Sequence, residues 1–208
     1  MASEQLLHDL CTHRAVEECA DCGVSGSLMC RFENVDLISF FLSFMTVGIA
    51  VVAGMLRGGY GWWLLGWLVI WVLFFFVVEG RVLCSHCPFW AEDSLVLHCH
   101  ANYGVIKFWK FRPGPMNRLE KWSFGAGAAV FGLYPLVFLV LGGEWLLLVI
   151  GVTAIASSAL NLRRNVCVRC VNFSCPVNAV PKSLVDAYLR RNPIMREAWE
   201  AAGYRLDE

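Results

Sequence analysis

The chain contains four long stretches in which most positions are apolar and none is charged. They cover residues 37–55, 60–78, 122–141 and 145–162. Each stretch is long enough for an α-helix to cross the ~30 Å hydrocarbon core of a bilayer at ~1.5 Å per residue. The links at residues 57–59 and 142–144 are so short that each pair must form an antiparallel hairpin. The pattern predicts an all-α integral membrane protein with four transmembrane helices in two hairpins.

The polar segments divide the chain into five parts. We expect an N-terminal Cys-rich segment, a first hairpin, a Cys/His loop, a second hairpin, and a C-terminal Cys triad with a helical tail. Their bounds are 1–36, 37–80, 81–121, 122–162 and 163–208. In the tail, apolar residues at positions 184, 185, 188 and 189 share one helical face, and Asn192-Pro193 ends that helix before a second short one. Pro135 lies inside the third run, where we expect a kink rather than a break.

Composition supports a membrane protein and excludes other classes. The chain is 58% hydrophobic and 16% charged, whereas soluble proteins are about 45–50% apolar and about 25% charged. The excess apolar surface must therefore face lipid. Seventeen basic residues balance seventeen acidic ones, which removes the electrostatic basis for binding nucleic acid.

The basic residues are distributed unequally between the two sides. Four spans place residues 1–36, 81–121 and 163–208 on one side, and Arg57 is the single Lys or Arg on the other. The positive-inside rule then places both termini and the central loop in the cytoplasm. Residues 1–30 are polar without an apolar core, so we expect the first span to act as its own insertion signal.

The apolar runs themselves carry little chemistry. They contain no ionisable residue, which argues against a pump or an ion channel. All histidines lie outside them, so a bis-histidine haem between the helices is excluded. We expect their few polar residues to form helix-packing contacts; these are Ser39, Ser43, Thr46, Thr153, Ser157 and Ser158.

The ten cysteines all lie outside the runs, on the side with the termini. Cys11 stands alone, and the others form three triads, each a CxxC pair followed by a third cysteine. The triads are Cys19, Cys22 and Cys30; Cys84, Cys87 and Cys99; and Cys167, Cys170 and Cys175. The second and third each follow a hairpin, which suggests an internal repeat and leaves gene duplication open.

Several kinds of chemistry use cysteines in this pattern. Packing does not explain ten cysteines on one face, and cytoplasmic thiols stay reduced, which argues against disulfides. A thioredoxin-like pair would need a βαβ pattern that the sequence lacks. We therefore interpret the triads, with His98 and His100 beside Cys99, as metal ligands in a cytoplasmic cap.

The sequence leaves the metal open between zinc and an iron–sulfur cluster, with a slight preference for zinc. Irregular spacings and nearby imidazoles suit zinc, and Cys11 or His13 could complete the first triad. Cys175-Pro176 resembles the end of a cluster motif, but the compact cluster run is absent. The third triad has no histidine after residue 146, so its fourth ligand must come from another segment. Such a site would clamp the two hairpins together.

The central loop also alternates aromatic and basic residues between positions 103 and 122. This composition is typical of a segment at the lipid headgroups. A sharper interpretation is a binding site for an anionic cofactor or partner, with Lys110 and Arg112 as its cations.

Together these features predict a metal-binding subunit of a larger membrane complex, in contact with lipid and with protein partners. With zinc its role would be structural or anchoring; with an iron–sulfur cluster it would transfer electrons from a cytoplasmic donor to a quinone. The alternative is a membrane enzyme that uses His98, Cys99 or His100 at the lipid surface. Four spans with a Cys-rich loop resemble the architecture of the DHHC palmitoyltransferases. The Asp-His-His-Cys motif is absent, so this resemblance carries no residue roles.

Overall fold

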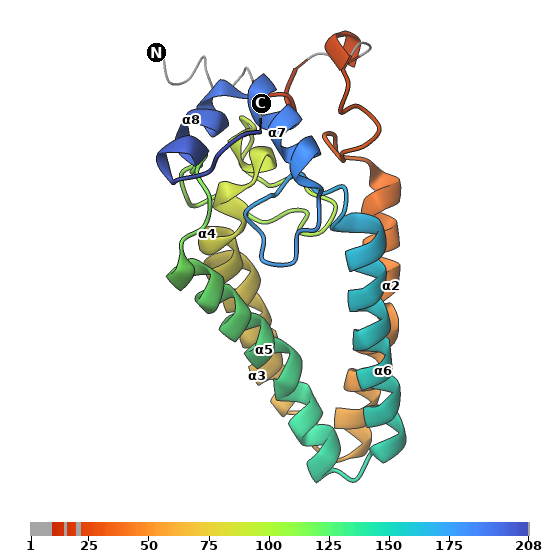
Figure 1. The fold of residues 1–208 in the computed structure, drawn as a ribbon. Helices are drawn as coiled ribbons and strands as arrows, with labels where there is room; N and C mark the ends of the chain where they lie inside the picture. The colour runs from red at the N-terminus through yellow and green to blue at the C-terminus, as the bar shows by residue number, and fades with distance from the viewer. Residues whose placement is uncertain (1–9, 15, 20–21, 208) are drawn as a thin grey trace.

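All four apolar runs form helices in the computed structural model of the chain, which describes residues 10–14, 16–19 and 22–207 (Figure 1). Within these residues, four helical stretches are long and apolar enough to cross a membrane. The first is α2 (Asn34–Arg57) and the third is α5 (Arg118–Leu141). The described part of the chain has no β-strand, only isolated bridges. The protein is therefore all-helical and membrane-embedded by length and composition.

The second and fourth helices extend beyond their apolar runs. α3 (Trp63–Val72) continues through the π-helical η2 (Leu73–Glu79) into α4 (Gly80–Val82) and a final turn, η3 (Cys84–His86). α6 (Trp145–Asn161) likewise continues as η5 (Leu162–Val166). The main-chain N–H of Leu83 still donates to the Glu79 carbonyl at 2.9 Å. The helix therefore continues past the apolar run that ends at residue 78, because loss of apolar character marks the end of lipid contact and not of the helix.

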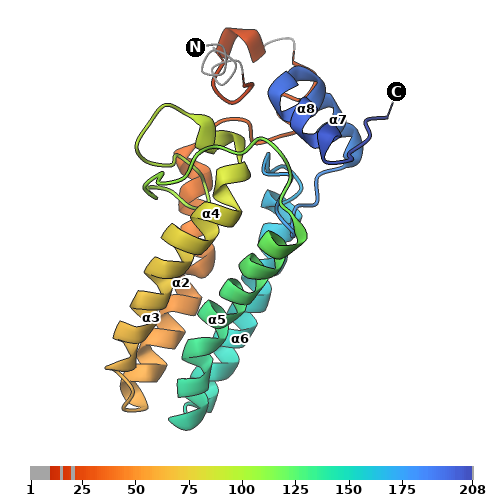
Figure 2. The same ribbon diagram turned by 90° about the vertical axis from the view of Figure 1, so that its left-hand side faces the viewer.

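The four long helices pack as two pairs, the first with the fourth and the second with the third. α2 lies along α6, and the α3–η2 helix lies along α5, as both views show (Figures 1 and 2). The pairs meet closely at the ends that carry the short turns and diverge toward the opposite end (Figure 1). Ser158 Oγ donates to the Ser43 carbonyl, and Asn161 Nδ2 donates to Ser43 Oγ at 3.2 Å. Ser43 and Ser158 are therefore helix-packing contacts, as expected.

The two turns require glycine and lie against each other. Gly59 has a φ of +82° and Gly143 a φ of +68°, which only glycine adopts without strain. Arg57 Nε lies 3.4 Å from Glu144 Oε2, so an ion pair joins the turns. Pro135 lies inside α5, which continues through it.

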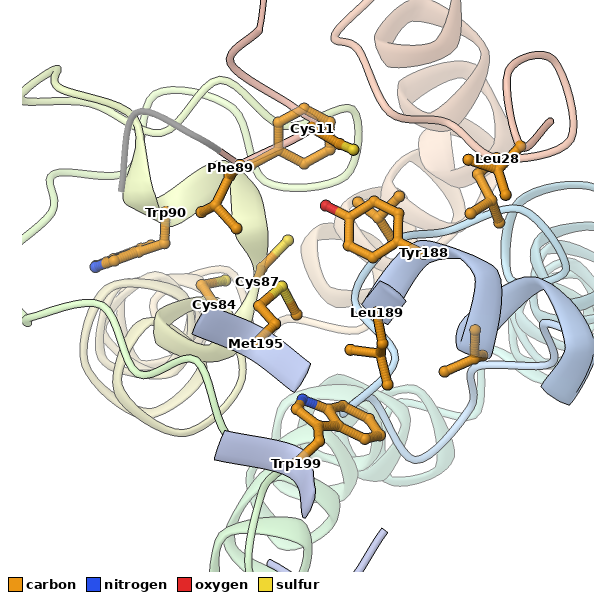
Figure 3. Packing of buried hydrophobic residues seen from close by; sticks show 14 of the residues in the cluster. Cys11, Leu28, Cys84, Cys87, Phe89, Trp90, Tyr188, Leu189, Met195 and Trp199 are labelled. Carbon is orange, nitrogen blue, oxygen red and sulfur yellow. The ribbon is translucent and has the colours of Figure 1, made fainter. Parts of the chain in front are cut away.

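Beyond the diverging ends lies a second body, which we call the cap: residues 10–33, 83–117 and 167–207, described except for residues 15, 20 and 21. Its regular elements are short: η1 (Val16–Cys19), η4 (Pro88–Ala91), α7 (Lys182–Arg191) and α8 (Pro193–Ala201). Tyr188 and Leu189 of α7 are completely buried, and Trp199 of α8 packs beside them (Figure 3). The two tail helices and their inward faces confirm the prediction from the sequence.

Candidate functional site

All ten cysteines lie in the cap, and they range from buried to partly exposed. They fall into two groups that differ from the three triads of the sequence. The N-terminal thiol group consists of Cys11, Cys19, Cys22 and Cys30, which line one cavity. The central thiol group combines the second and third triads: Cys84, Cys87, Cys99, Cys167, Cys170 and Cys175. Segments far apart in the sequence therefore share the central thiol group.

Backbone contacts hold the N-terminal thiol group against the rest of the cap. The Met29 N–H donates to the Arg169 carbonyl at 2.7 Å, within a bridge between Met29 and Cys170. The Cys11 N–H donates to Asn192 Oδ1 at 2.7 Å. Cys11 is thus fixed by the break between α7 and α8, a contact that no local pattern reveals.

The central thiol group is built from turns at the ends of two membrane helices. The Cys87 N–H donates to the Cys84 carbonyl at 2.9 Å, which closes the first turn. Asn172 Nδ2 donates to the Leu83 carbonyl at 3.2 Å and so ties the third triad to the end of the second helix. Asn102 Nδ2 donates a hydrogen bond to Cys84 Sγ at 3.6 Å.

Electrostatics show that thiols of the second and third triads are neighbours. Burial raises the pKa of Cys87 well above its ordinary value, and the charges of Cys99, Cys170 and Cys175 add to the rise. Burial likewise raises the pKa of Cys175, to about 11. These thiols are therefore protonated at neutral pH in the protein alone, and they become thiolates only if a cation compensates for the lost proton.

The thiols are gathered, but not at the distances of a single bound ion. Among the residues that the structure describes, no group of three or more His, Cys, Asp or Glu side chains is arranged to hold a metal ion. The candidate ligands therefore share a region of the cap without forming a closed tetrahedral set.

The three histidines of the central loop have different surroundings. His98 Nδ1 lies 2.7 Å from Glu92 Oε2. His100 is 2% exposed, and its Nδ1 has no hydrogen-bond partner in the structure. Burial lowers the pKa of His100, so its imidazole is neutral, which is the form that binds metals. His86 Nδ1 lies 2.5 Å from the Gly114 carbonyl oxygen.

The two candidate cations of the loop also differ. Lys110 is exposed. The Arg112 side chain pairs through Nη1 with Glu120 of α5. The main-chain N–H of Arg112 donates to the Ser85 carbonyl at 2.7 Å. Arg81 Nη1 lies 3.7 Å from the same carboxylate. Arg112 therefore attaches the loop to the start of α5, a role that the sequence interpretation missed.

Tyr188 links the two thiol groups. Its ring is completely buried and faces both Cys11 and Cys87 (Figure 3). Burial raises the pKa of Tyr188 well above its ordinary value, and the charges of Cys30, Cys11 and Cys87 contribute. Sequence reasoning assigned Tyr188 to helix packing and named Cys11 and His13 as alternatives to complete the first triad.

Comparison with protein-family models, curated proteins and solved structures finds no match for this chain. Its function is therefore inferred from the chemistry of the cap.

Proposed function

We propose that this protein is an integral membrane protein whose cap binds zinc or iron–sulfur clusters through its cysteines. The observation that carries the proposal is the convergence of ten cysteines from three separate segments at one end of the membrane helices. Random placement of packing cysteines would not leave the four spans free of them. The same candidate ligands follow from the sequence: the three triads together with His98 and His100.

The construction of the cap supports a structural need for metal. Its regular elements are α7 and α8 and a few single turns, and the rest is loop. Small, loop-rich units rarely bury enough apolar surface to be stable without disulfides or metals. Because metal-binding free energy is also folding free energy, ions held between the segments would stabilise the cap.

The state of the thiols favours metal binding over the alternative of an enzyme. A nucleophilic cysteine needs a lowered pKa, whereas burial raises the pKa of Cys99, the cysteine between the two loop histidines. A metal ion would reverse this effect, because it binds the thiolate directly. Cys99 therefore suits a ligand better than a catalytic nucleophile.

The proposed role depends on the metal. With zinc, the cap is a structural platform that anchors a protein partner within a membrane complex. With an iron–sulfur cluster, it passes electrons from a cytoplasmic donor to a quinone in the bilayer. We further propose that the helices insert as two hairpins with the cap in the cytoplasm, because sixteen of the seventeen Lys and Arg residues lie on its side.

Metal analysis of the purified full-length protein in detergent tests the proposal. Stoichiometric zinc in a colourless sample would support the structural role, and iron with acid-labile sulfide in a brown sample would support electron transfer. Cys170→Ser should lose metal. Val177→Ala, an exposed neighbour of the same triad, should keep it. Metal-free wild type, when purified without chelators and after reconstitution with either metal, would contradict the proposal.

A further inference from the structure

The N-terminal thiol group surrounds a cavity of about 250 Å³. All four of its cysteines line this cavity, and they come from both ends of the segment before α2. From the sequence, Cys11 and His13 were alternative fourth ligands for the first triad. In the structure Cys11 lines the same cavity as the triad, so four cysteines are present, the number that commonly ligates a cluster of iron and sulfide.

The size of the cavity separates a cluster from a single ion. With zinc–sulfur bonds of ~2.3 Å, four tetrahedral thiolates lie about 3.8 Å apart and leave no space between them. Among the described residues no three His, Cys, Asp or Glu side chains are preformed to hold a metal ion, so the choice of a cluster rests on the cavity that the four cysteines line. Thiols that line the wall of one cavity instead match a core of several atoms, in which each sulfur binds a different point on the surface of the core.

The charges around the cavity suit an anionic group. Four arginines line it, together with three carboxylates from Glu18, Glu33 and Asp36, so the side chains other than cysteine have an excess of one positive charge. The arginines are Arg14, Arg31, Arg169 and Arg191. An oxidised two-iron or four-iron core with four thiolates has a net charge of about −2. Arginines in the cavity wall offset the electrostatic repulsion between the thiolates.

Arg31 makes the most direct contact with the thiols. Its Nη2 donates to Cys19 Sγ at 3.4 Å, and the same nitrogen donates to the Arg14 carbonyl at 2.6 Å. Hydrogen bonds to ligating sulfurs and nearby positive charge both raise the reduction potential of a cluster. Arg31 is thus placed to hold the first triad and to tune what it binds.

We propose that Cys11, Cys19, Cys22 and Cys30 hold an iron–sulfur cluster in this cavity, an inference that rests on the proposed metal-binding function of the cap. On binding, each thiol releases its proton to solvent and its sulfur forms a bond to iron. The central thiol group is a separate site, and its metal is not specified by this inference.

Anaerobic reconstitution of the full-length protein with ferric iron, sulfide and dithiothreitol tests the inference. Cys11→Ser and Cys30→Ser should each lose the iron and sulfide of one cluster and, after reduction with dithionite, its electron paramagnetic resonance signal. Cys167→Ser, in the central thiol group, is the matched control and should keep that signal. Equal iron and sulfide in the wild type and in both N-terminal variants would overturn the inference and leave the metal-binding proposal intact.

A variant that keeps every cysteine guards against simple misfolding. Arg31→Gln should retain the cluster but shift its reduction potential to a more negative value, because a positive charge and a donor to sulfur are lost. An unchanged potential would remove Arg31 from the site. Zinc lost from Cys11→Ser in place of iron would overturn the cluster assignment alone. Wild type that binds no metal would overturn both proposals.

Discussion

At the residue scale, the thiols show which features of the cap can be predicted from sequence. The sequence grouped nine cysteines into three triads, each a CxxC pair with one further cysteine. The pairs could be recognised because two thiols in a tight turn lie close together whatever the fold. For the fourth ligand of the first triad, the sequence left Cys11 and His13 as alternatives. The position of Cys11 depends on the hydrogen bond from its main-chain N–H to Asn192, which is 181 residues away, and Cys11 lines the same cavity as the triad.

The raised thiol pKa values predict slow alkylation of the metal-free protein. The pKa of Cys175 is raised from 9.0 to about 11, so its thiolate fraction at pH 8 is about a hundredfold smaller than that of a free cysteine. Its alkylation by iodoacetamide should rise about tenfold per pH unit until pH approaches that pKa. Mass spectrometry of the labelled peptide measures the rate, with denatured protein as the control. Equal rates at pH 8 in folded and denatured samples would contradict the burial of Cys175.

At the element scale, hydropathy predicted the four membrane helices but not their ends or their partners. The runs mark where side chains meet lipid, and that signal stops at the first charges. Helical hydrogen bonding continues as far as His86 and Val166. The contact between the two pairs depends on small sites such as Gly54 of α2, where an added Cβ would lie 2.8 Å from Leu139 Cγ of α5. Because these helices are apolar on every face, such contact positions produce no hydrophobic periodicity that could be recognised in the sequence.

Packing between η2 and α5 predicts a position-specific cost for adding one methyl group. At Gly127 an added Cβ would lie 2.7 Å from the Phe74 ring, which is itself buried. Gly127→Ala should therefore lower stability by about 1–3 kcal/mol, as overpacking does. Gly125→Ala on the same helix meets nothing within 4 Å and should leave stability unchanged or slightly higher. Thermal unfolding in one detergent compares them, and equal losses would contradict this packing.

The start of α5 predicts a second stability difference. The side chain of Glu120 is 11% exposed, completes a capping box with Asn117, and pairs with Arg112. Glu120→Gln should cost about 1–3 kcal/mol, because buried groups lose a charged partner. Glu144 pairs with the exposed Arg57 at the opposite end, so Glu144→Gln should cost less than about 1 kcal/mol. Denaturant unfolding distinguishes the two, and a larger loss at Glu144 would contradict the account.

At the scale of the whole molecule, the pairing of the first helix with the fourth and of the second with the third explains why the cap must join all segments. The two pairs meet through glycines near the turns and diverge toward the cap (Figure 1). The ends of the two pairs next to the cap are therefore held together by few contacts between the helices themselves. Asn172, which lies between Cys170 and Cys175, donates a hydrogen bond to the Leu83 carbonyl at the end of the second helix. The Met29 N–H donates one to the Arg169 carbonyl. We expected from the sequence that distant segments share a thiol site, and these contacts bring such segments together. The metal expected at that site stays a prediction.

The arrangement of charges and thiols predicts how the molecule is oriented in the membrane. Every cysteine belongs to the cap end, and the opposite end exposes only the turns with Arg57 and Glu144. If the cap faces the cytoplasm, an impermeant maleimide added to intact cells should label none of the ten native thiols. Trp62 is 85% exposed beside the first turn, so Trp62→Cys should become labelled from outside.

Lysis supplies the internal control for this experiment. After lysis and removal of metal, the partly exposed thiols of Cys19, Cys22 and Cys30 should react, while Trp62→Cys should gain no further label. The reverse pattern, with native thiols labelled before lysis and Trp62→Cys protected, would place the cap outside the cell. The thiols would then lie in an oxidising environment, where disulfides persist. The pairs that lie close together in the cap would become candidates for disulfides, and metal binding would lose its main chemical support.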